Sequence, residues 1–541
     1  MRGLNQPMKL SLDMIRFCLR CLCAALCFLG ASVVSAQDGG FDVLEFAVEG
    51  NTVLPALAIE RAVYPQLGPG GGVAAVNAAR DALERAYHDA GYLTVTVEVP
   101  QQKVDGGLVR LQVVEGRVER LKVSGAEYTL PSKVREQTPS MARGEVPNFN
   151  DVQEDLTRLG RNPDLRINPL LRPSARPGSI EVELAMDDKS PLHGSLELNS
   201  KKSADTDAGR LEGAVRYDNL WQRRHSIGIN YFVSPTNRDD VEVWGVNYAA
   251  PLGEATVAGF FARSTSDVPT AFDTQSIGNG DTMGFRWIRP LPALPGFFHS
   301  LSLGADYKDN AQRTELGGGF SLSQPIKYWT PVVQYNAGWQ RGPGMWRLGA
   351  GFSFGLDGLN RKDIDCNGVT VDQFECRRPG AEPTFSVLRL DLEYTRPFGA
   401  GWVGKSRIDV QRASGPLVNT EQFSAGGMDS VRGYLEGERQ GDDGLKWSSE
   451  LATPALWVIA ERYPVTAFSF YDWAHLETQD TLPGQDASVV LASAGVGLRL
   501  GEGRGLKAEL AWAQVFHAGA DGPKRTVDGD SQAMVRVKYE F

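Results

Sequence analysis

From residue 193 onward the chain alternates apolar and charged side chains in segments of about ten residues. The two faces of Phe385–Tyr394 carry Leu388, Leu390, Leu392 and Tyr394 on one side and Arg389, Asp391 and Glu393 on the other. A soluble sandwich would have to bury one of these faces and could not keep so many charges there. A membrane barrel instead turns the apolar face to lipid and the charged face to a water-filled lumen. The pattern therefore predicts a transmembrane β-barrel.

The spacing of these segments predicts sixteen antiparallel strands. They lie near residues 193, 209, 225, 239, 254, 280, 299, 329, 345, 384, 401, 445, 463, 488, 504 and 531. Short turns alternate with long connections, which we expect at 310–328, 357–383, 413–444, 474–487 and 517–530. Long loops on one rim and tight turns on the other are typical of outer-membrane barrels. Gly317–Phe320 is a candidate for an additional strand.

The first 36 residues have the pattern of a secretory signal peptide. Arg16 and Arg20 flank the apolar run Cys21–Val34, and Val34-Ser35-Ala36 offers small residues for cleavage. The run is too short for a stable membrane anchor, and after it no apolar run of about 20 residues follows. We expect the mature chain to begin near Gln37 and to cross the membrane only as a closed barrel.

Four of the six cysteines leave with the signal, so Cys366 and Cys376 remain as a pair in an exported chain. Such a pair predicts a local disulfide. The same loop holds Asp363, Asp365 and Asn367, which are spaced like the start of a calcium loop. The closing acid is one place late, at Glu375. An acidic, solvated loop is therefore favoured over a metal site.

Residues 41–188 mix helix and strand signals. Phe41–Val48 alternates, Ala74–Ala90 has helical spacing, and β-rich segments follow on either side of the turn Gly106-Gly107. The same order returns between residues 118 and 185. Two small β-α-α-β-β modules of similar length are the economical interpretation.

Four groups of motifs in this order resemble a known family. The motifs are Gly91-Tyr92, Val99-Pro100-Gln101-Gln102, Gly107 and Val113-Val114-Glu115-Gly116, then Asn162-Pro163-Asp164 with Arg176-Pro177-Gly178, then Val431-Arg432-Gly433-Tyr434, and last Phe470-Tyr471-Asp472. The chain resembles the outer-membrane transporters of two-partner secretion (the TpsB, hemolysin secretion/activation type). These transporters belong to a superfamily that joins polypeptide-transport-associated (POTRA) domains to a barrel.

The resemblance implies a signal peptide at 1–36, POTRA domain 1 at 37–117, POTRA domain 2 at 118–190 and a 16-stranded antiparallel barrel at 191–541. It implies a Gram-negative outer membrane, periplasmic POTRA domains and export of one large unfolded exoprotein with an N-terminal secretion domain. Further expected partners are outer-membrane lipid and the barrel assembly machinery, which would contact the last strand ending at Phe541. Some members carry a plug helix before the first POTRA domain, but only Gln37–Gly40 fill that place here.

The resemblance also implies roles for the last two motifs. The loop at about 413–444 would fold into the lumen and carry Val431, Arg432, Gly433 and Tyr434. Phe470 and Asp472 would be its partners in the barrel wall. A guanidinium matches a carboxylate in bidentate geometry, so we expect Arg432 to pair with Asp472.

Other functions fit the sequence less well. The net charge of −10 argues against a nucleic-acid surface. The six histidines show no ligand spacing and no nucleophile motif accompanies them, so we expect no enzyme and no cofactor. A passive porin would not need a receptor of about 150 residues in front of the barrel. An assembly factor of the same superfamily is the closest alternative, although two POTRA domains are few for that role.

Overall fold

The computed structural model describes residues 40–541 except 161, 205, 266–269, 273–274, 278, 317–319, 367, 482–484 and 520–524. The predicted signal peptide lies outside the described residues. The described chain divides into two compact units. One contains residues up to 123 together with 135–159 and 168–185, and the other contains 124–134, 160–167 and 186–541. None of the described helices is both long and apolar enough to span a membrane.

The first module packs helices on a three-stranded sheet. Its elements are β1 (Glu45–Glu49), α2 (Ala56–Val63), η1 (Tyr64–Gln66), α3 (Gly72–Asp89), β2 (Thr96–Glu98) and β3 (Leu108–Val114). Helix α3 buries Val76, Leu83 and Tyr87 on one face, as amphipathic spacing dictates. The sheet order is β1-β3-β2, with β1 parallel to β3. The element order predicted from the sequence is confirmed.

Residues 117–188 repeat this order of elements. They form β4 (Arg117–Ser124), α4 (Pro131–Glu136), η2 (Pro139–Met141), α5 (Phe149–Leu159), β5 (Leu165–Pro173) and β6 (Ser179–Asp188). The sheet order is β4-β6-β5, so the last strand again lies in the centre. The two modules therefore share their order of elements and the central place of their last strand.

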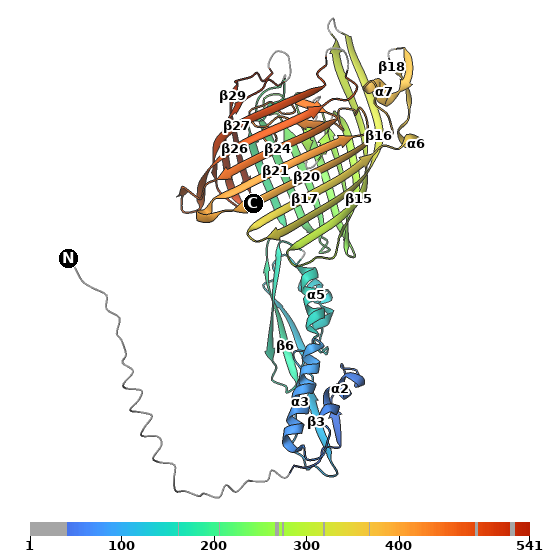
Figure 1. Ribbon diagram of the computed structural model, residues 1–541, viewed down its shortest axis with the longest axis vertical. Coiled ribbons are helices and arrows are strands. Elements are labelled where there is room, and N and C mark those ends of the chain that lie inside the picture. The colour runs from blue at the N-terminus through green and yellow to red at the C-terminus, as the bar shows by residue number, and fades with distance from the viewer. Residues whose placement is uncertain are drawn as a thin grey trace, which may run out of the picture. The chain divides into compact units, whose positions relative to one another are not determined.

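The rest of the chain is a closed antiparallel barrel of sixteen long strands in the described residues (Figure 1). They are β7 (Leu192–Asn199), β8 (Arg210–Leu220), β9 (His225–Val233), β10 (Glu242–Leu252), β11 (Ala255–Ser264), β14 (Gly280–Pro290), β15 (Phe297–Leu316), β16 (Phe320–Arg341), β17 (Gly344–Phe354), β20 (Ser386–Pro397), β21 (Val403–Ala413), β24 (Asp443–Ala452), β26 (Tyr463–Glu477), β27 (Ser488–Leu500), β28 (Gly505–Val515) and β29 (Ser531–Glu540). The predicted fold class and strand count are confirmed.

Smaller elements lie between these strands. They are β12 (Thr270–Phe272), β13 (Gln275–Ile277), α6 (Asp357–Asn360), β18 (Asp363–Cys366), β19 (Val369–Asp372), α7 (Gln373–Arg377), η3 (Gly399–Gly401), β22 (Phe423–Ala425), β23 (Arg439–Gly441) and β25 (Trp457–Ile459). Three of the resulting hairpins, β12-β13, β18-β19 and β22-β23, form sheets separate from the barrel.

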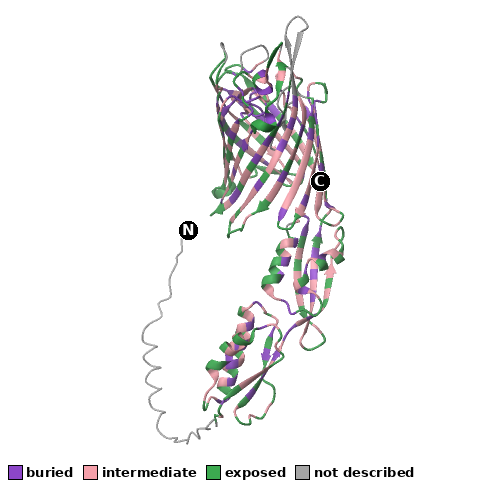
Figure 2. Ribbon diagram, turned by 90° about the vertical axis from the view of Figure 1, so that its right-hand side faces the viewer, coloured by how far each residue is buried: buried purple, intermediate pink, exposed green. Residues whose placement is uncertain are grey.

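The barrel strands turn apolar side chains outward and charged side chains inward. Leu388 and Leu390 are exposed on the outer face of β20, whereas Arg389 and Asp391 line a cavity inside the barrel. Figure 2 shows exposed and half-buried residues along the strands, with buried residues gathered toward one end of the barrel. This distribution is that of a lipid-facing wall around a water-filled lumen.

The barrel closes where β29 pairs with β7. Only five residue pairs form this seam, from Arg536 opposite Asn199 to Glu540 opposite Ser195. Every other pair of neighbouring long strands has a longer register in the described residues. The seam is therefore the shortest ladder in the barrel wall.

The predicted loop at 310–328 is wrong. Strand β15 continues to Leu316 and β16 begins at Phe320, and the two pair along their whole length. Residues 317–319 of the candidate additional strand lie outside the described residues, and Phe320 belongs to β16. The sequence does not show the extension because a strand pair beyond the membrane no longer needs the apolar-out alternation that marked the barrel strands.

Candidate functional site in the barrel lumen

The connection between β21 and β24 carries the predicted loop motif. Within it, β22 and β23 form a short hairpin, and the chain between them packs against the barrel wall. Val431, Arg432 and Tyr434 are all buried, although they belong to a loop between strands. We call residues 414–442 the lumen loop.

Arg432 and Asp472 form a bidentate ion pair. The Nε atom of Arg432 lies 2.7 Å from Oδ2 of Asp472, and its Nη2 atom lies 2.8 Å from Oδ1. The backbone N–H of Arg432 also donates to Oδ2, at 3.1 Å. The Asp472 side chain is 1% exposed and that of Arg432 is 8% exposed. The structure thus brings together the arginine and the carboxylate that the sequence analysis paired.

More groups on β24, β26 and β27 complete this contact. Glu450 accepts from Nη1 of Arg432 at 3.1 Å and also binds Arg499. The guanidinium carbon of Arg432 lies 3.6 Å from the centre of the Phe470 ring, a cation–π distance. Phe470 and Asp472 therefore hold the same guanidinium, one by its face and one by its edge. The sequence analysis did not find Glu450 or Arg499, whose charges resemble those of any lumen-facing strand.

Val431 and Tyr434, on either side of Gly433, each contact the barrel wall. Val431 belongs to an apolar cluster with Leu491 of β27 and Val515 of β28. The Tyr434 hydroxyl lies 2.8 Å from the carbonyl oxygen of His517 and accepts from the backbone N–H of Ala492. Both side chains therefore have specific packing or hydrogen-bond partners on β27, on β28 or just after it.

Gly433 is required by its backbone and its surroundings. Its φ of 92° lies in the region that favours glycine. A Cβ atom at this position would lie 3.0 Å from Ala513 Cβ and 3.1 Å from Val515 Cγ2. A larger residue would therefore push the lumen loop away from β28.

Asp429 adds an ion-pair cluster that sequence reasoning missed. Its carboxylate lies 3.0 Å from Nζ of Lys201, which follows β7, and also pairs with Arg536 of β29. It therefore links the segment just after β7 to β29, at the end of the short ladder that closes the barrel. Partial loss of hydration would raise the pKa of Asp429, but the cations Lys201 and Arg536 lower it to about 2. Its partners are too distant in the sequence to be recognised there.

Two further carboxylates of the lumen loop form ion pairs with other parts of the barrel unit. Glu421 lies 2.6 Å from Nζ of Lys308 on β15, and both side chains are buried. Arg378, from the 357–383 connection, donates to both carboxylate oxygens of Asp442. The loop is thus held by ion pairs on several sides of the lumen.

The 357–383 connection contains the Cys366–Cys376 disulfide. Asp363 and Asp365 lie on β18, where Asp365 accepts from the backbone N–H of Gly368 at 2.6 Å. Asn367, the third residue of the weak calcium candidate, lies outside the described residues. Among the described side chains, Asp363 and Asp365 do not join a third ligand in a group close enough to hold a metal ion.

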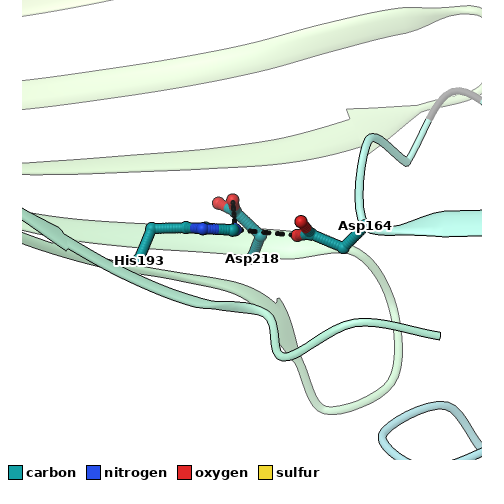
Figure 3. Close-up of side chains that lie close together, drawn as sticks. All are labelled: Asp164, His193 and Asp218. Carbon is teal, nitrogen blue, oxygen red and sulfur yellow. Dashed lines mark hydrogen bonds and ion pairs between the residues drawn. The ribbon is translucent and has the colours of Figure 1, made fainter. Parts of the chain in front are cut away.

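Asp164, His193 and Asp218 form a cluster within the unit that contains the barrel (Figure 3). Nε2 of His193 lies 2.8 Å from Asp164 and 3.4 Å from Asp218, and one ligand atom from each residue falls within 4.8 Å of the others. No spacing in the sequence indicates this cluster, because its members are not close in the chain. The partners of His193 come from separate segments of the chain.

The contact with Arg504 indicates which tautomer of the His193 ring fits this cluster. Its Nη2 atom lies 3.1 Å from Nδ1 of His193, and a guanidinium can only donate. Nδ1 must therefore accept, so Nε2 carries the proton and donates to Asp164. A metal on Nε2 would force the proton onto Nδ1, directly against Arg504. The arrangement favours a structural contact, in which His193 is hydrogen-bonded between Asp164 and Arg504, over a metal site.

Comparisons with known proteins agree with this architecture. Residues 41–116 match the family model described as "POTRA domain, ShlB-type", and residues 332–500 match "Haemolysin secretion/activation protein ShlB/FhaC/HecB". The outer membrane transporter CdiB of Dickeya dadantii is 23% identical over 412 residues, which are 72% of this chain and 68% of that protein. The outer membrane transporter CdiB of Escherichia coli is 25% identical over 468 residues, 81% of this chain and 74% of that protein.

Solved structures share the fold. CdiB from Escherichia coli superposes with a TM-score of 0.61 at 18% identity, covering 95% of this chain and 93% of that one. CdiB from Acinetobacter baumannii gives 0.54 at 14% identity, with coverages of 98% and 97%. BamA from Haemophilus ducreyi lacking POTRA domains 1–3 gives 0.53 at 14% identity, with coverages of 93% and 100%. Both lumen motifs lie inside the matched segment 332–500.

Proposed function

Because this chain belongs to the ShlB/FhaC/HecB family, the outer-membrane transporters of two-partner secretion, we propose that it passes one large unfolded exoprotein to the cell surface. It lies in the outer membrane, with its N-terminal POTRA domain in the periplasm. The family is one of transporters and not of enzymes. We further propose that the chain performs no catalysis.

The observation that carries this proposal is the seated lumen loop inside a sixteen-stranded barrel. A barrel of this size encloses an aqueous channel, whereas eight strands would be filled by side chains. Two cavities of about 470 and 630 Å³ lie inside this barrel, against the inner face of its wall. An extended chain needs one continuous path, so the loop must move for export. Arg432, Asp472 and Asp429 hold the loop in the resting position.

The two periplasmic modules supply the receptor. Residues 118–190 are proposed to form the second POTRA domain, because their element order and sheet order match those of the first. A sheet edge binds an extended chain through backbone hydrogen bonds with little demand on its sequence. Such an edge suits a client that must stay unfolded until it leaves the pore. Folding of the exoprotein outside would then bias its transit outward.

Membrane contacts follow from the outer face of the barrel. Val535, Val537, Tyr539 and Phe541 are exposed at the end of the chain, and we propose that lipid covers the strand. The same strand, which ends at Phe541, is the proposed contact for the barrel assembly machinery. The Asp164–His193–Arg504 contact is proposed to fix the segment 160–167 to the turns at the base of the barrel.

The proposal is tested by deleting the gene and complementing it with the wild-type chain. The exoprotein encoded nearby should disappear from the culture medium on deletion and return on complementation. The amounts of other outer-membrane barrels, measured in the same membranes, should not change. A general loss of those barrels, with no dependent exoprotein, would support an assembly factor instead.

The pore should close more firmly at mildly acidic pH. Burial raises the pKa of Glu436 in the lumen loop to about 7, although Lys201 lowers it in part. When the loop leaves its seat and Glu436 meets water, its pKa returns to about 4.3. The seated loop therefore binds more protons, and this contribution is complete below about pH 4 and lost as the pH rises through about 7.

Planar-bilayer conductance measures this dependence. We expect open events to be more frequent at pH 8 than at pH 6, and Glu436→Gln to remove most of the difference. An unchanged pH profile in the Glu436→Gln variant would contradict the role of this carboxyl group.

A further inference from the structure

Strands β15 and β16 extend beyond their neighbours on the rim opposite the chain's entry into the barrel. Strand β14 pairs with β15 only as far as Asn310, and β17 pairs with β16 only from Val332 onward. In Figure 1 the hairpin rises beyond the rim, with α7 and β18 beside it. Counted along the antiparallel strands from the periplasmic start of β7, this rim faces the cell exterior. The outer part of β16 therefore has one edge without a neighbouring strand.

A bare edge at this place would be a hazard for a protein exporter. Unpaired N–H and C=O groups on an edge strand are a template for any extended chain. The proposed function delivers an unfolded polypeptide to this rim. The edge of β16 would then compete with correct folding of the exoprotein outside the cell.

Two side-chain amides occupy this edge. Gln373 accepts from the backbone N–H of Lys327 at 3.0 Å and donates to the carbonyl oxygen of the same residue at 2.9 Å. Asn360 does the same at Trp329, at 2.8 and 2.9 Å. Each amide reproduces the pair of hydrogen bonds that a strand partner would make. Both amides are buried, with 0% exposure for Asn360 and 2% for Gln373.

Prolines occupy the positions on either side. Residues two apart in a strand present their backbone groups to the same neighbour, so Pro325 and Pro331 share the free edge with Lys327 and Trp329. Proline has no N–H to donate. From residue 325 to residue 331, every position that faces the free edge is therefore either a proline or capped by an amide.

The connection that provides the amides is firmly held. The Cys366–Cys376 disulfide closes it, and Phe374 packs against Tyr328 on the inner face of β16, with ring centres 5.3 Å apart. Because Asn360 and Gln373 lie on either side of β18 and β19, the closed hairpin also fixes the distance between the two amides. The disulfide, the buried amides and the extended hairpin thus form one arrangement.

We propose that residues 357–383 guard the extracellular edge of β16 against strand addition by the emerging exoprotein. This inference rests on the proposed function for the identity of the excluded chain. Asn360 and Gln373 fill the ladder positions at Trp329 and Lys327, and Pro325 and Pro331 remove the donors beside them. The exoprotein consequently leaves the rim without pairing to the transporter.

The test removes the amides of Asn360 and Gln373 from the edge of β16 and measures which chain then binds to this edge. Asn360→Leu with Gln373→Met keeps similar side-chain volumes and frees the backbone groups of both residues. A second variant, Pro325→Thr, restores one donor on the edge without touching the guard. Thr370→Val, an exposed change on β19, is the matched control. A photo-reactive phenylalanine analogue at position 327 reports on the exposed face of β16 in secreting cells.

We expect cross-linking of the exoprotein to rise on the order of tenfold in the double variant, because several backbone hydrogen bonds become available. A smaller rise is expected for Pro325→Thr and none for Thr370→Val. Heat-modifiable migration in gels confirms that each barrel is folded. Normal secretion with unchanged cross-linking in both test variants would overturn the guard. Cross-links between two transporter copies would overturn the exoprotein as the excluded partner. Failure of the wild type to secrete any exoprotein would instead contradict the proposed function.

Discussion

Replacing Arg432 with alanine is expected to reduce secretion of the exoprotein by at least about tenfold while the barrel still inserts. The change leaves Asp472 and Glu450 buried without their shared cation. Removing one partner of a buried ion pair costs about 3–5 kcal/mol, and water in the lumen reduces this figure. Even about 2 kcal/mol would shift the loop's seating equilibrium about thirtyfold. A loop that leaves its seat without the exoprotein and does not return to it would lie across the lumen and obstruct the exoprotein's path.

Exoprotein in the medium and transporter in the membrane are measured together, so that secretion is compared at matched transporter levels. Arg439→Ala provides the control, because Arg439 lies in the same loop but pairs with an exposed partner, Asp486. A double-mutant cycle with Asp472→Ala should show strong non-additivity, since either change alone already breaks the pair. Undiminished secretion by Arg432→Ala would mean that the seat of the loop does not matter for export.

The barrel and the ion pair at its wall follow from short-range patterns. Alternation along Phe385–Tyr394 has a period of two, which is the side-chain period of a strand, so it survives in the sequence without knowledge of neighbours. The motif around Arg432 and the motif ending at Asp472 are each contiguous, so a resemblance could pair them. The same reasoning could not show that Glu450 shares the arginine, because its position on β24 is set by strand register.

Features that depend on the meeting of distant segments were not predictable. His193 meets Asp164 and Arg504 only after the barrel closes, and no local spacing marks such a contact. The extension of β15 and β16 was also missed, because outside the membrane the alternation of apolar and charged residues no longer has to hold. The caps on β16 depend on where Asn360 and Gln373 land, and the sequence near them indicates only a polar loop.

Asp429→Asn is expected to weaken the closed state of the pore without preventing insertion. The substitution keeps the size of the side chain but removes the charge shared by Lys201 and Arg536. The Asp429 side chain is half-exposed, so we expect about 1 kcal/mol and not the cost of a buried pair. Open events in planar bilayers should then become about fivefold more frequent. Asp528→Asn, an exposed change in the 517–530 connection, is the control.

Ionic strength separates this anchor from the one at Arg432. Charges in contact with lumen water are screened by salt, whereas a buried bidentate pair is screened much less. The difference between Asp429→Asn and wild type should therefore shrink between about 0.15 and 1 M salt, while that of Arg432→Ala should persist. Because Lys201 lies just after β7 and Arg536 lies on β29, the two strands of the shortest ladder, the loss of Asp429 should also lower the temperature at which the barrel unfolds in gels. Equal salt dependence of the two variants would contradict the assignment of Asp429 as a separate, water-exposed anchor at the seam.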